Sequence, residues 1–134
     1  MRARERDYSG RTLFEKLGVF SDAHVALVGP HDESFVAALN AQLAKSASQA
    51  LRTEYDIIFV RVNTPRDLAR IARAAEHLKS NGALWVFHPK GRGASPHDAH
   101  VRAAGIDAGL VDNKISAYTG THTATRFVIP LARR

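Results

Sequence analysis

The sequence contains no cysteine, and this absence excludes several kinds of chemistry at once. Without a thiol, the chain has no disulfide, no thiolate metal ligand and no cysteine nucleophile. A chain without disulfides is typical of a reducing compartment, so we expect a cytoplasmic location. No apolar run approaches the roughly 18 residues that a membrane-spanning helix needs, and the N-terminal residues lack the apolar stretch of a signal peptide. We therefore expect neither secretion nor membrane insertion.

The common motifs of hydrolytic and phosphate-binding sites are absent as well. The chain has no Gly-x-Ser-x-Gly elbow, no His-Glu-x-x-His helix, no His-x-Glu deaminase signature and no Walker-type phosphate loop. Seven histidines are present, and His97 and His100 are spaced to share a helix face, but two ligands do not make a metal site. We therefore predict no catalytic residue and no metal site.

Charge is unbalanced toward the basic side, with 19 lysines and arginines against 13 acidic residues and a formal net charge of +6. A basic excess raises the expectation of a polyanionic partner such as nucleic acid. Much of this excess lies near the two ends of the chain, at Arg2, Arg4, Arg6, Arg11, Arg133 and Arg134. We therefore interpret residues 1–11 as a basic N-terminal arm and consider a nucleic-acid partner less favoured than a solubilising surface.

Residues 12–134 show a regular alternation of strand and helix patterns, at a length that suits one domain with one core. Apolar runs at residues 24–28, 56–62 and 83–87 are typical of strands buried on both faces of a parallel sheet. Two further strand patterns, at residues 115–118 and 125–131, flank a short turn and predict a hairpin.

Four helices are expected, one before the first strand and three between strands. Three of them begin with a residue that favours an N-cap, at Thr12, Thr64 and Ser95, and the other helical pattern begins at Asp32. The pair Asn81-Gly82 is expected to end the third helix. Residues 46–53, after the second helix, are ambiguous: they could continue the helix, form a loop or hold a short strand near residues 50–52. These patterns predict a single Rossmann-like α/β domain. Its sheet is mostly parallel, with helices on both faces and a C-terminal antiparallel β-hairpin.

Several short stretches resemble a bacterial family known as domain of unknown function number 3052. They are Tyr8-Ser9-Gly10, Lys16-Leu17-Gly18, Ala83-Leu84-Trp85-Val86, Pro89-Lys90, Arg126-Phe127 and, most specifically, Ala108-Gly109-Leu110-Val111-Asp112-Asn113-Lys114. The resemblance covers most of the chain. It implies no activity.

The order of elements is also similar to the class I methyltransferase sheet with part of its first half shortened. That class has a glycine-rich turn after the first strand, where the cofactor approaches, and an acidic residue after the second strand for the ribose hydroxyls. Here the turn is Gly29-Pro30-His31-Asp32-Glu33, with one glycine. Proline has no N–H and the two acidic residues repel phosphate, so the turn also suits dinucleotides poorly.

Two groups of polar residues are candidates for a ligand site. Lys90 and Arg92 lie in a glycine-containing loop after a predicted strand, where their charges and the next helix could hold an anion; a flexible basic loop is the other interpretation. Asp112, Asn113 and Lys114 lie at the entrance to the predicted hairpin. They could orient a ligand, hold the Lys90 loop by hydrogen bonds, or cap a turn.

Together these observations favour a non-catalytic domain that acts through a protein partner or self-association, and they lean against an enzyme. The alternative is a binder of a small anionic ligand or nucleotide-like cofactor at the His88–Arg92 loop. A degenerate methyltransferase that depends on S-adenosylmethionine is less favoured. The sequence identifies no cofactor.

Overall fold

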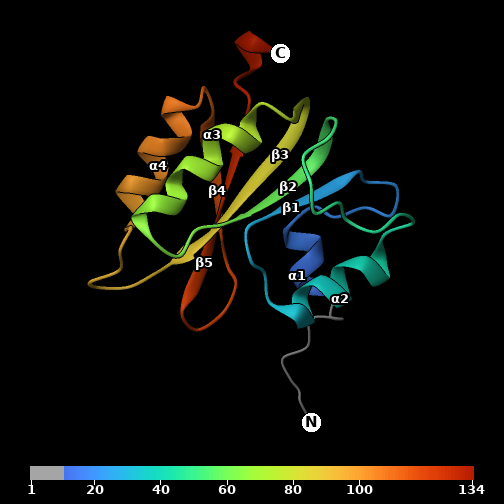
Figure 1. Ribbon diagram of the computed structural model, residues 1–134, viewed down its shortest axis with the longest axis horizontal. Coiled ribbons are helices and arrows are strands. Elements are labelled where there is room, and N and C mark those ends of the chain that lie inside the picture. Colours follow the sequence, from blue (N-terminus) through green and yellow to red (C-terminus); the bar gives the residue numbers. More distant parts are fainter. Residues whose placement is uncertain (1–10) are drawn as a thin grey trace.

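The computed structural model of the protein describes residues 11–134. The basic arm expected over residues 1–11 therefore lies outside the described residues, except for Arg11, which begins the first helix. The described chain forms one five-stranded sheet with the strands in the order β1 (Val25–Val28), β2 (Tyr55–Arg61), β3 (Leu78–Pro89), β5 (His122–Val128) and β4 (Val111–Ala117) (Figure 1).

Strand directions confirm the predicted fold class. The first three strands pair in parallel, whereas β5 is antiparallel to both β3 and β4. It follows that β4 runs in the same direction as the first three strands, and that the C-terminal hairpin turns back only at β5. The protein is a single Rossmann-like α/β domain, as the strand and helix patterns predict.

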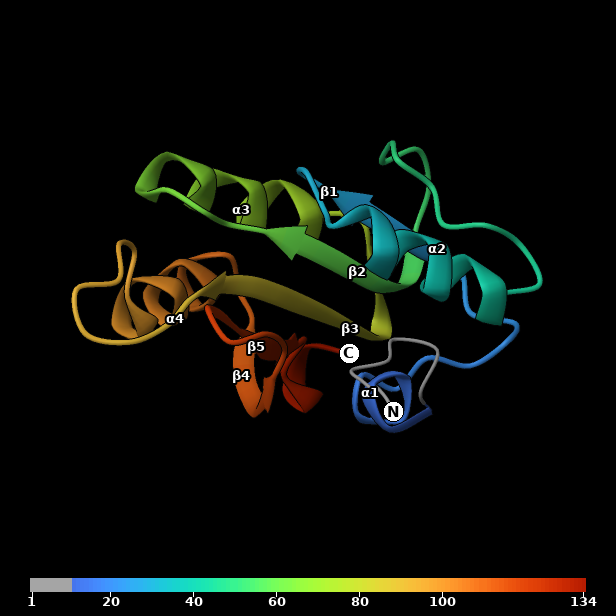
Figure 2. The ribbon, with the colours of Figure 1, turned by 90° about the horizontal axis from the view of Figure 1, so that it is seen from below.

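Alternation of apolar residues along the strands produces two cores, one on each face of the sheet. In β2, Ile57 and Phe59 point to one face and Ile58 and Val60 to the other, and all four are buried. The first face is covered by α1 (Arg11–Lys16) and α2 (Glu33–Gln42), and the second by α3 (Ala69–Ala75) and α4 (Asp98–Asp107). Figure 2 shows α3 and α4 together at one end of the molecule and α1 and α2 at the other.

The first helix packs on the sheet as a lid. Its Phe14 is buried and stacks on Phe35 of α2 with 5.7 Å between ring centroids. Trp85 in β3 donates its indole N–H to the carbonyl oxygen of Leu17 over 3.0 Å, which fixes the end of the helix to the sheet. Gly18 then ends the helix with a φ of 74°, as predicted.

The ambiguous segment after α2 holds no extended strand. A single parallel bridge joins Ser48 to Ala26 of β1, two residues before the positions considered for a short strand. The Ser48 carbonyl accepts a hydrogen bond from the Leu27 N–H over 2.8 Å, and the Ser48 N–H donates to the Val25 carbonyl over 2.8 Å. The pairing of this segment with the sheet is thus reduced to the single bridge residue Ser48.

The third helix is shorter than predicted. A 3-10 turn (Pro65–Leu68), capped by Thr64, leads into α3, which ends at Ala75 rather than at Asn81-Gly82. The reason is that Leu78 pairs with Tyr55 and extends β3 backward through the presumed stop signal. Gly82 lies within this strand, where a Cβ would come within 2.8 Å of the Asp56 carbonyl oxygen.

The remaining elements differ from the prediction only at their bounds. The fourth helix begins at Asp98 with His97 in the N-cap position, not at Ser95, and ends where Gly109 has a φ of 88°. Both hairpin strands are shifted, and β4 includes Asp112, Asn113 and Lys114. Among the helices of residues 11–134, none is long and apolar enough to cross a membrane.

Candidate functional site

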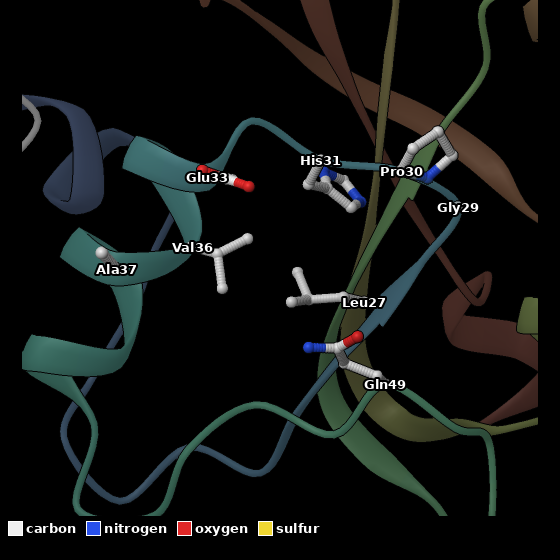
Figure 3. Close-up of a pocket in the computed structure, with 8 residues that line it drawn as sticks. All are labelled: Leu27, Gly29, Pro30, His31, Glu33, Val36, Ala37 and Gln49. Carbon is white, nitrogen blue, oxygen red and sulfur yellow. The ribbon is translucent and has the colours of Figure 1, made fainter.

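A cavity of about 460 Å³ lies at the carboxyl end of β1, between that strand and α2 (Figure 3). Leu27 of β1 and Val36 and Ala37 of α2 form its apolar wall. In an open parallel sheet the carboxyl ends of the strands are the edge where ligands bind, and this volume is in the range of small-molecule sites. The cavity is therefore the candidate site.

Three polar side chains complete the cavity wall. Glu33 lies in the first turn of α2, His31 lies in the turn after β1, and Gln49 directly follows the bridge residue Ser48. Although the segment after α2 pairs with β1 through a single bridge, that bridge is enough to hold Gln49 beside β1. The wall thus combines an apolar surface with a carboxylate, an imidazole and an amide.

The turn after β1 requires its one glycine for two reasons. Gly29 has a φ of 86°, a conformation that L side chains rarely adopt. A Cβ at this position would also lie 2.7 Å from Nη1 of Arg70, which donates a hydrogen bond to the Arg61 carbonyl over 2.8 Å. The space left by the missing side chain is therefore occupied by the Arg70 guanidinium.

His31 in the cavity wall is a neutral imidazole that donates one hydrogen bond. Its Nε2 lies 2.9 Å from the Phe59 carbonyl oxygen, and because a carbonyl only accepts, Nε2 carries the proton. Nδ1 then holds a lone pair; it is buried and has no hydrogen-bond partner among the described residues. Burial, with a smaller effect from Arg61, lowers the pKa of His31 to about 4.

Acid should destabilise the protein through His31. Between about pH 6.5 and pH 4 the unfolded chain binds a proton at this residue and the folded chain does not, so the free energy of unfolding falls as the pH falls. From pH 7.5 to pH 5 we expect a loss of about 2 kcal/mol from this group. Urea denaturation at several pH values measures the loss, which should be missing in His31→Gln, since an amide can still donate to Phe59. An equal pH dependence in both proteins would show that His31 ionises normally.

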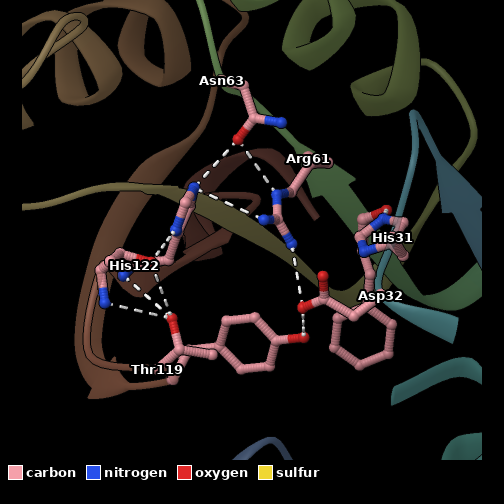
Figure 4. A network of polar contacts seen from close by, with 9 residues as sticks. His31, Asp32, Arg61, Asn63, Thr119 and His122 are labelled. Atoms are coloured by element: carbon pink, nitrogen blue, oxygen red, sulfur yellow. Dashed lines mark hydrogen bonds and ion pairs between the residues drawn. The ribbon is translucent and has the colours of Figure 1, made fainter. Parts of the chain in front are cut away.

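Asp32, next to His31, is held as a carboxylate. Its Oδ2 accepts a hydrogen bond from the Tyr118 hydroxyl over 2.7 Å and lies 3.4 Å from Nη1 of Arg61 (Figure 4). The Tyr118 hydrogen bond is the main cause that lowers the pKa of Asp32, and Arg61 adds to it. The Asp32 side chain therefore does not cap α2, although it occupies the N-cap position.

A second set of contacts connects the ends of β2 and β5. The Asn63 Oδ1 lies 3.1 Å from Nε of Arg61 and 2.9 Å from Nε2 of His122. The guanidinium can only donate, so Asn63 Oδ1 is an acceptor for both side chains and Nε2 of His122 carries its proton. Burial and the neighbouring Arg61 lower the pKa of His122. These contacts continue from Asp32 through Arg61 to His122 along one edge of the sheet.

Lys90 and Arg92, predicted as ligand-binding residues, are exposed in the loop after β3. The Lys90 N–H donates to the Thr121 carbonyl over 3.1 Å, so the loop lies beside the hairpin turn and at the same edge of the sheet as the cavity. Neither side chain lines the cavity. Their role in binding stays a prediction.

The other three predicted residues lie at the opposite end of the strands. Asp112 is opposite Phe127 near the start of β4, whereas the cavity edge is at the far end of β3. The side chains there bond to local partners: Asp112 to Arg102 at 3.0 Å, Asn113 to Arg126 at 3.2 Å, and Lys114 to the Lys16 carbonyl at 3.2 Å. They do not hold the Lys90 loop, as one interpretation of the sequence suggested.

Sequence reasoning missed the residues that form the polar edge, Arg61, Asn63 and His122. One signal was present, because Arg61 is the only charged residue between Ile57 and Val62 in an otherwise apolar strand. A charged side chain in a buried strand needs partners, and Arg61 finds them at the end of the strand. The partners themselves, distant in sequence, have no local pattern.

Comparison with solved structures gives matches over most of the chain. The magnesium protoporphyrin IX methyltransferase of Synechocystis with bound S-adenosylmethionine is 13% identical, with a TM-score of 0.65, over 89% of this chain and 76% of that one. The CcbJ methyltransferase of Streptomyces caelestis is 9% identical, with a TM-score of 0.59, and the match covers 92% of this chain and 89% of that one. An O-methyltransferase family protein of Burkholderia thailandensis is 14% identical, with a TM-score of 0.58, and the match covers 88% of this chain and 54% of that one.

The fold is methyltransferase-like. This confirms the topological resemblance and corrects the expectation that leaned against an enzyme, because the matched solved structures are methyltransferases. That expectation relied on the incomplete cofactor turn at Gly29 and on the lack of a recognisable acid and base pair, and the fold forms without either feature. No protein-family model matches the sequence, and the curated proteins give no match, so the resemblance to domain of unknown function number 3052 is not confirmed.

Proposed function

We propose that the protein is a small methyltransferase that binds S-adenosylmethionine in the cavity at the carboxyl end of β1. The observation that supports this proposal is the composition of the cavity wall, which suits a cationic, hydroxyl-bearing ligand with a flat apolar part. When bound, S-adenosylmethionine supplies an electrophilic methyl group. The residues of the chain bind and orient it.

Each part of the wall has a partner on such a ligand. Leu27 and Val36 offer an apolar surface to the adenine ring, and the Gln49 amide can both donate to and accept from ribose hydroxyls. Gln49 follows the bridge residue Ser48, in the place where methyltransferases of this class have a second strand followed by an acidic residue. An amide therefore takes the place of that carboxylate. The Glu33 carboxylate suits the positive charge of the sulfonium and amino groups.

The same wall disfavours ligands with phosphate groups. Asp32 and Glu33 both follow the turn after β1, and Pro30 removes one backbone N–H from it. A pyrophosphate in the cavity would meet the Glu33 carboxylate and few donors, unlike at a glycine-rich dinucleotide turn. Nicotinamide dinucleotides are therefore suitable negative controls for binding.

Glu33→Gln should weaken S-adenosylmethionine binding about two- to fivefold at low salt and weaken S-adenosylhomocysteine binding less, because the latter keeps the amino group but lacks the sulfonium charge. The two ligands differ by the charged sulfonium, and removal of one carboxylate from a partly solvated site changes an ion interaction by up to about 1 kcal/mol. Isothermal titration calorimetry measures both affinities, with Glu15→Gln on α1, outside the cavity, as the matched control. An equal loss for both ligands would contradict the charge-based role of Glu33.

A further inference from the structure

We propose that His122 accepts the proton of the methyl acceptor and that this acceptor is a hydroxyl compound, an inference that rests on the proposed methyl transfer. The argument depends on the position of the imidazole, on its tautomer and on the group that already contacts its free nitrogen. Each of these follows from contacts at the ends of β2 and β5.

His122 begins β5 at the edge of the sheet that holds the cavity. Its backbone pairs with Pro89 at the end of β3, and a chain of polar contacts connects its side chain through Asn63 and Arg61 to Asp32, the neighbour of the cavity residue His31 (Figure 4). The imidazole is partly exposed at this edge. An acceptor that binds beside the cavity would meet His122 on the hairpin side.

Asn63 fixes the tautomer of His122. Its Oδ1 accepts from Nε2 of the imidazole over 2.9 Å, and the Arg61 Nε–H donates to the same oxygen over 3.1 Å, which holds the amide in that orientation. Because Nε2 carries a proton, its 3.5 Å approach to Nη2 of Arg61 is not a hydrogen bond. The lone pair of His122 is therefore on Nδ1, and Asn63 is a positioning residue.

A hydroxyl already occupies the place where an acceptor would bind. The Thr121 Oγ1 lies 2.9 Å from Nδ1 of His122, and because Nδ1 has only a lone pair to offer, the hydroxyl must donate. Thr121 is exposed, so its side chain can turn away and give this position to the hydroxyl of an acceptor. A carboxylate acceptor has no proton to give to Nδ1, so a hydroxyl compound fits best.

The charges around His122 keep it neutral at neutral pH. Burial is the main influence, and the guanidinium of Arg61 on β2 and the imidazole of His88 on β3 add to it, whereas Asp32 opposes them. A neutral imidazole oriented by a neighbouring amide is the form that a general base requires.

The transfer step balances with these groups. A lone pair of the acceptor oxygen forms the new bond to the methyl carbon, and the bond between sulfur and that carbon breaks with its electron pair left on sulfur. The acceptor proton moves to Nδ1 of His122 and then to solvent. The products are the methyl ether and S-adenosylhomocysteine.

Nitrogen-15 spectra of the imidazoles in the whole protein test the tautomer without any substrate. We expect His122 with the proton on Nε2 and a pKa below 6.5, and loss of this tautomer preference in Asn63→Ala but not in Asn63→Gln, which keeps an amide oxygen. A proton on Nδ1 in the wild-type protein would overturn the assignment.

Methyl transfer from S-adenosylmethionine to catechol, phenol, benzylamine and benzoate tests the acceptor class. We expect methylation of the hydroxyl probes, and a fall in kcat of at least about 100-fold in His122→Gln, together with loss of the acidic limb of the pH profile. The matched control is His97→Gln, because His97 is an exposed histidine in the N-cap position of α4.

Each result of the transfer assay is decisive. Three outcomes would overturn the inference. The first is methylation confined to the amine or carboxylate probe, and the second is no methylation of any hydroxyl probe by protein that binds S-adenosylmethionine. The third is full activity in His122→Gln. Calorimetry on each variant separates the two proposals, since a wild-type protein that does not bind S-adenosylmethionine contradicts the proposed function itself.

Discussion

Replacement of Ala37 by Trp is expected to weaken S-adenosylmethionine binding at least about 100-fold while the protein stays folded. Ala37 lies on the exposed side of α2 and lines the cavity, so an indole there fills the space that the ligand needs. A 100-fold change corresponds to about 2.7 kcal/mol of binding free energy. Because Ala37 is exposed and contributes nothing to the buried core, the free energy of unfolding should change little.

A matched variant separates occlusion of the cavity from a general effect of an exposed indole. Ala41 lies one turn further along α2, is also exposed and does not line the cavity, so Ala41→Trp should bind like the wild-type protein. Isothermal titration calorimetry measures both affinities. Equal binding by Ala37→Trp and Ala41→Trp would place the ligand elsewhere.

Gly105→Ala should lower the free energy of unfolding by about 2–3 kcal/mol. Gly105 is buried in α4, and an added Cβ would overlap the Phe127 ring, which belongs to the second core. Overpacking of this kind costs roughly 1–3 kcal/mol, or more where the neighbours cannot move, and it outweighs the gain of about 1 kcal/mol in helix propensity. Phe127 is fully buried and has little room to move.

Urea denaturation measures this loss, and Gly120→Ala is the control. Gly120 lies in the hairpin turn, is exposed, and an added Cβ there has no atom within 4 Å, so we expect a change below about 0.5 kcal/mol. A Gly105→Ala protein at least as stable as the wild type would mean that α4 shifts on the sheet without cost. That result would contradict the close contact between Gly105 of α4 and the Phe127 ring of β5.

The elements of the fold were predictable where the pattern is local. Apolar runs identify β1 and β2, because a strand buried on both faces needs apolar residues at nearly every position. The end of the third helix was not predictable from Asn81-Gly82. The pairing of Leu78 with Tyr55, a contact between distant residues, turns the apparent stop signal into strand.

The candidate site was predictable only in its position on the sheet. The rule that ligands bind at the carboxyl ends of parallel strands indicated the edge that holds the cavity, and both Gly29 and the Lys90 loop are there. The partners of Arg61 were not predictable, since Asp32 and His122 meet it only because the strand order places their segments together. No periodicity in a single sequence encodes that order.

The most direct test of the proposed cofactor site is a two-dimensional nitrogen-15 NMR titration of the whole protein with S-adenosylmethionine. We predict chemical-shift changes at Gly29, Val36 and Gln49 around the cavity, and none at Asn113 at the opposite end of the strands. The absence of any change, or changes confined to the loop of Lys90 and Arg92, would contradict the proposed site.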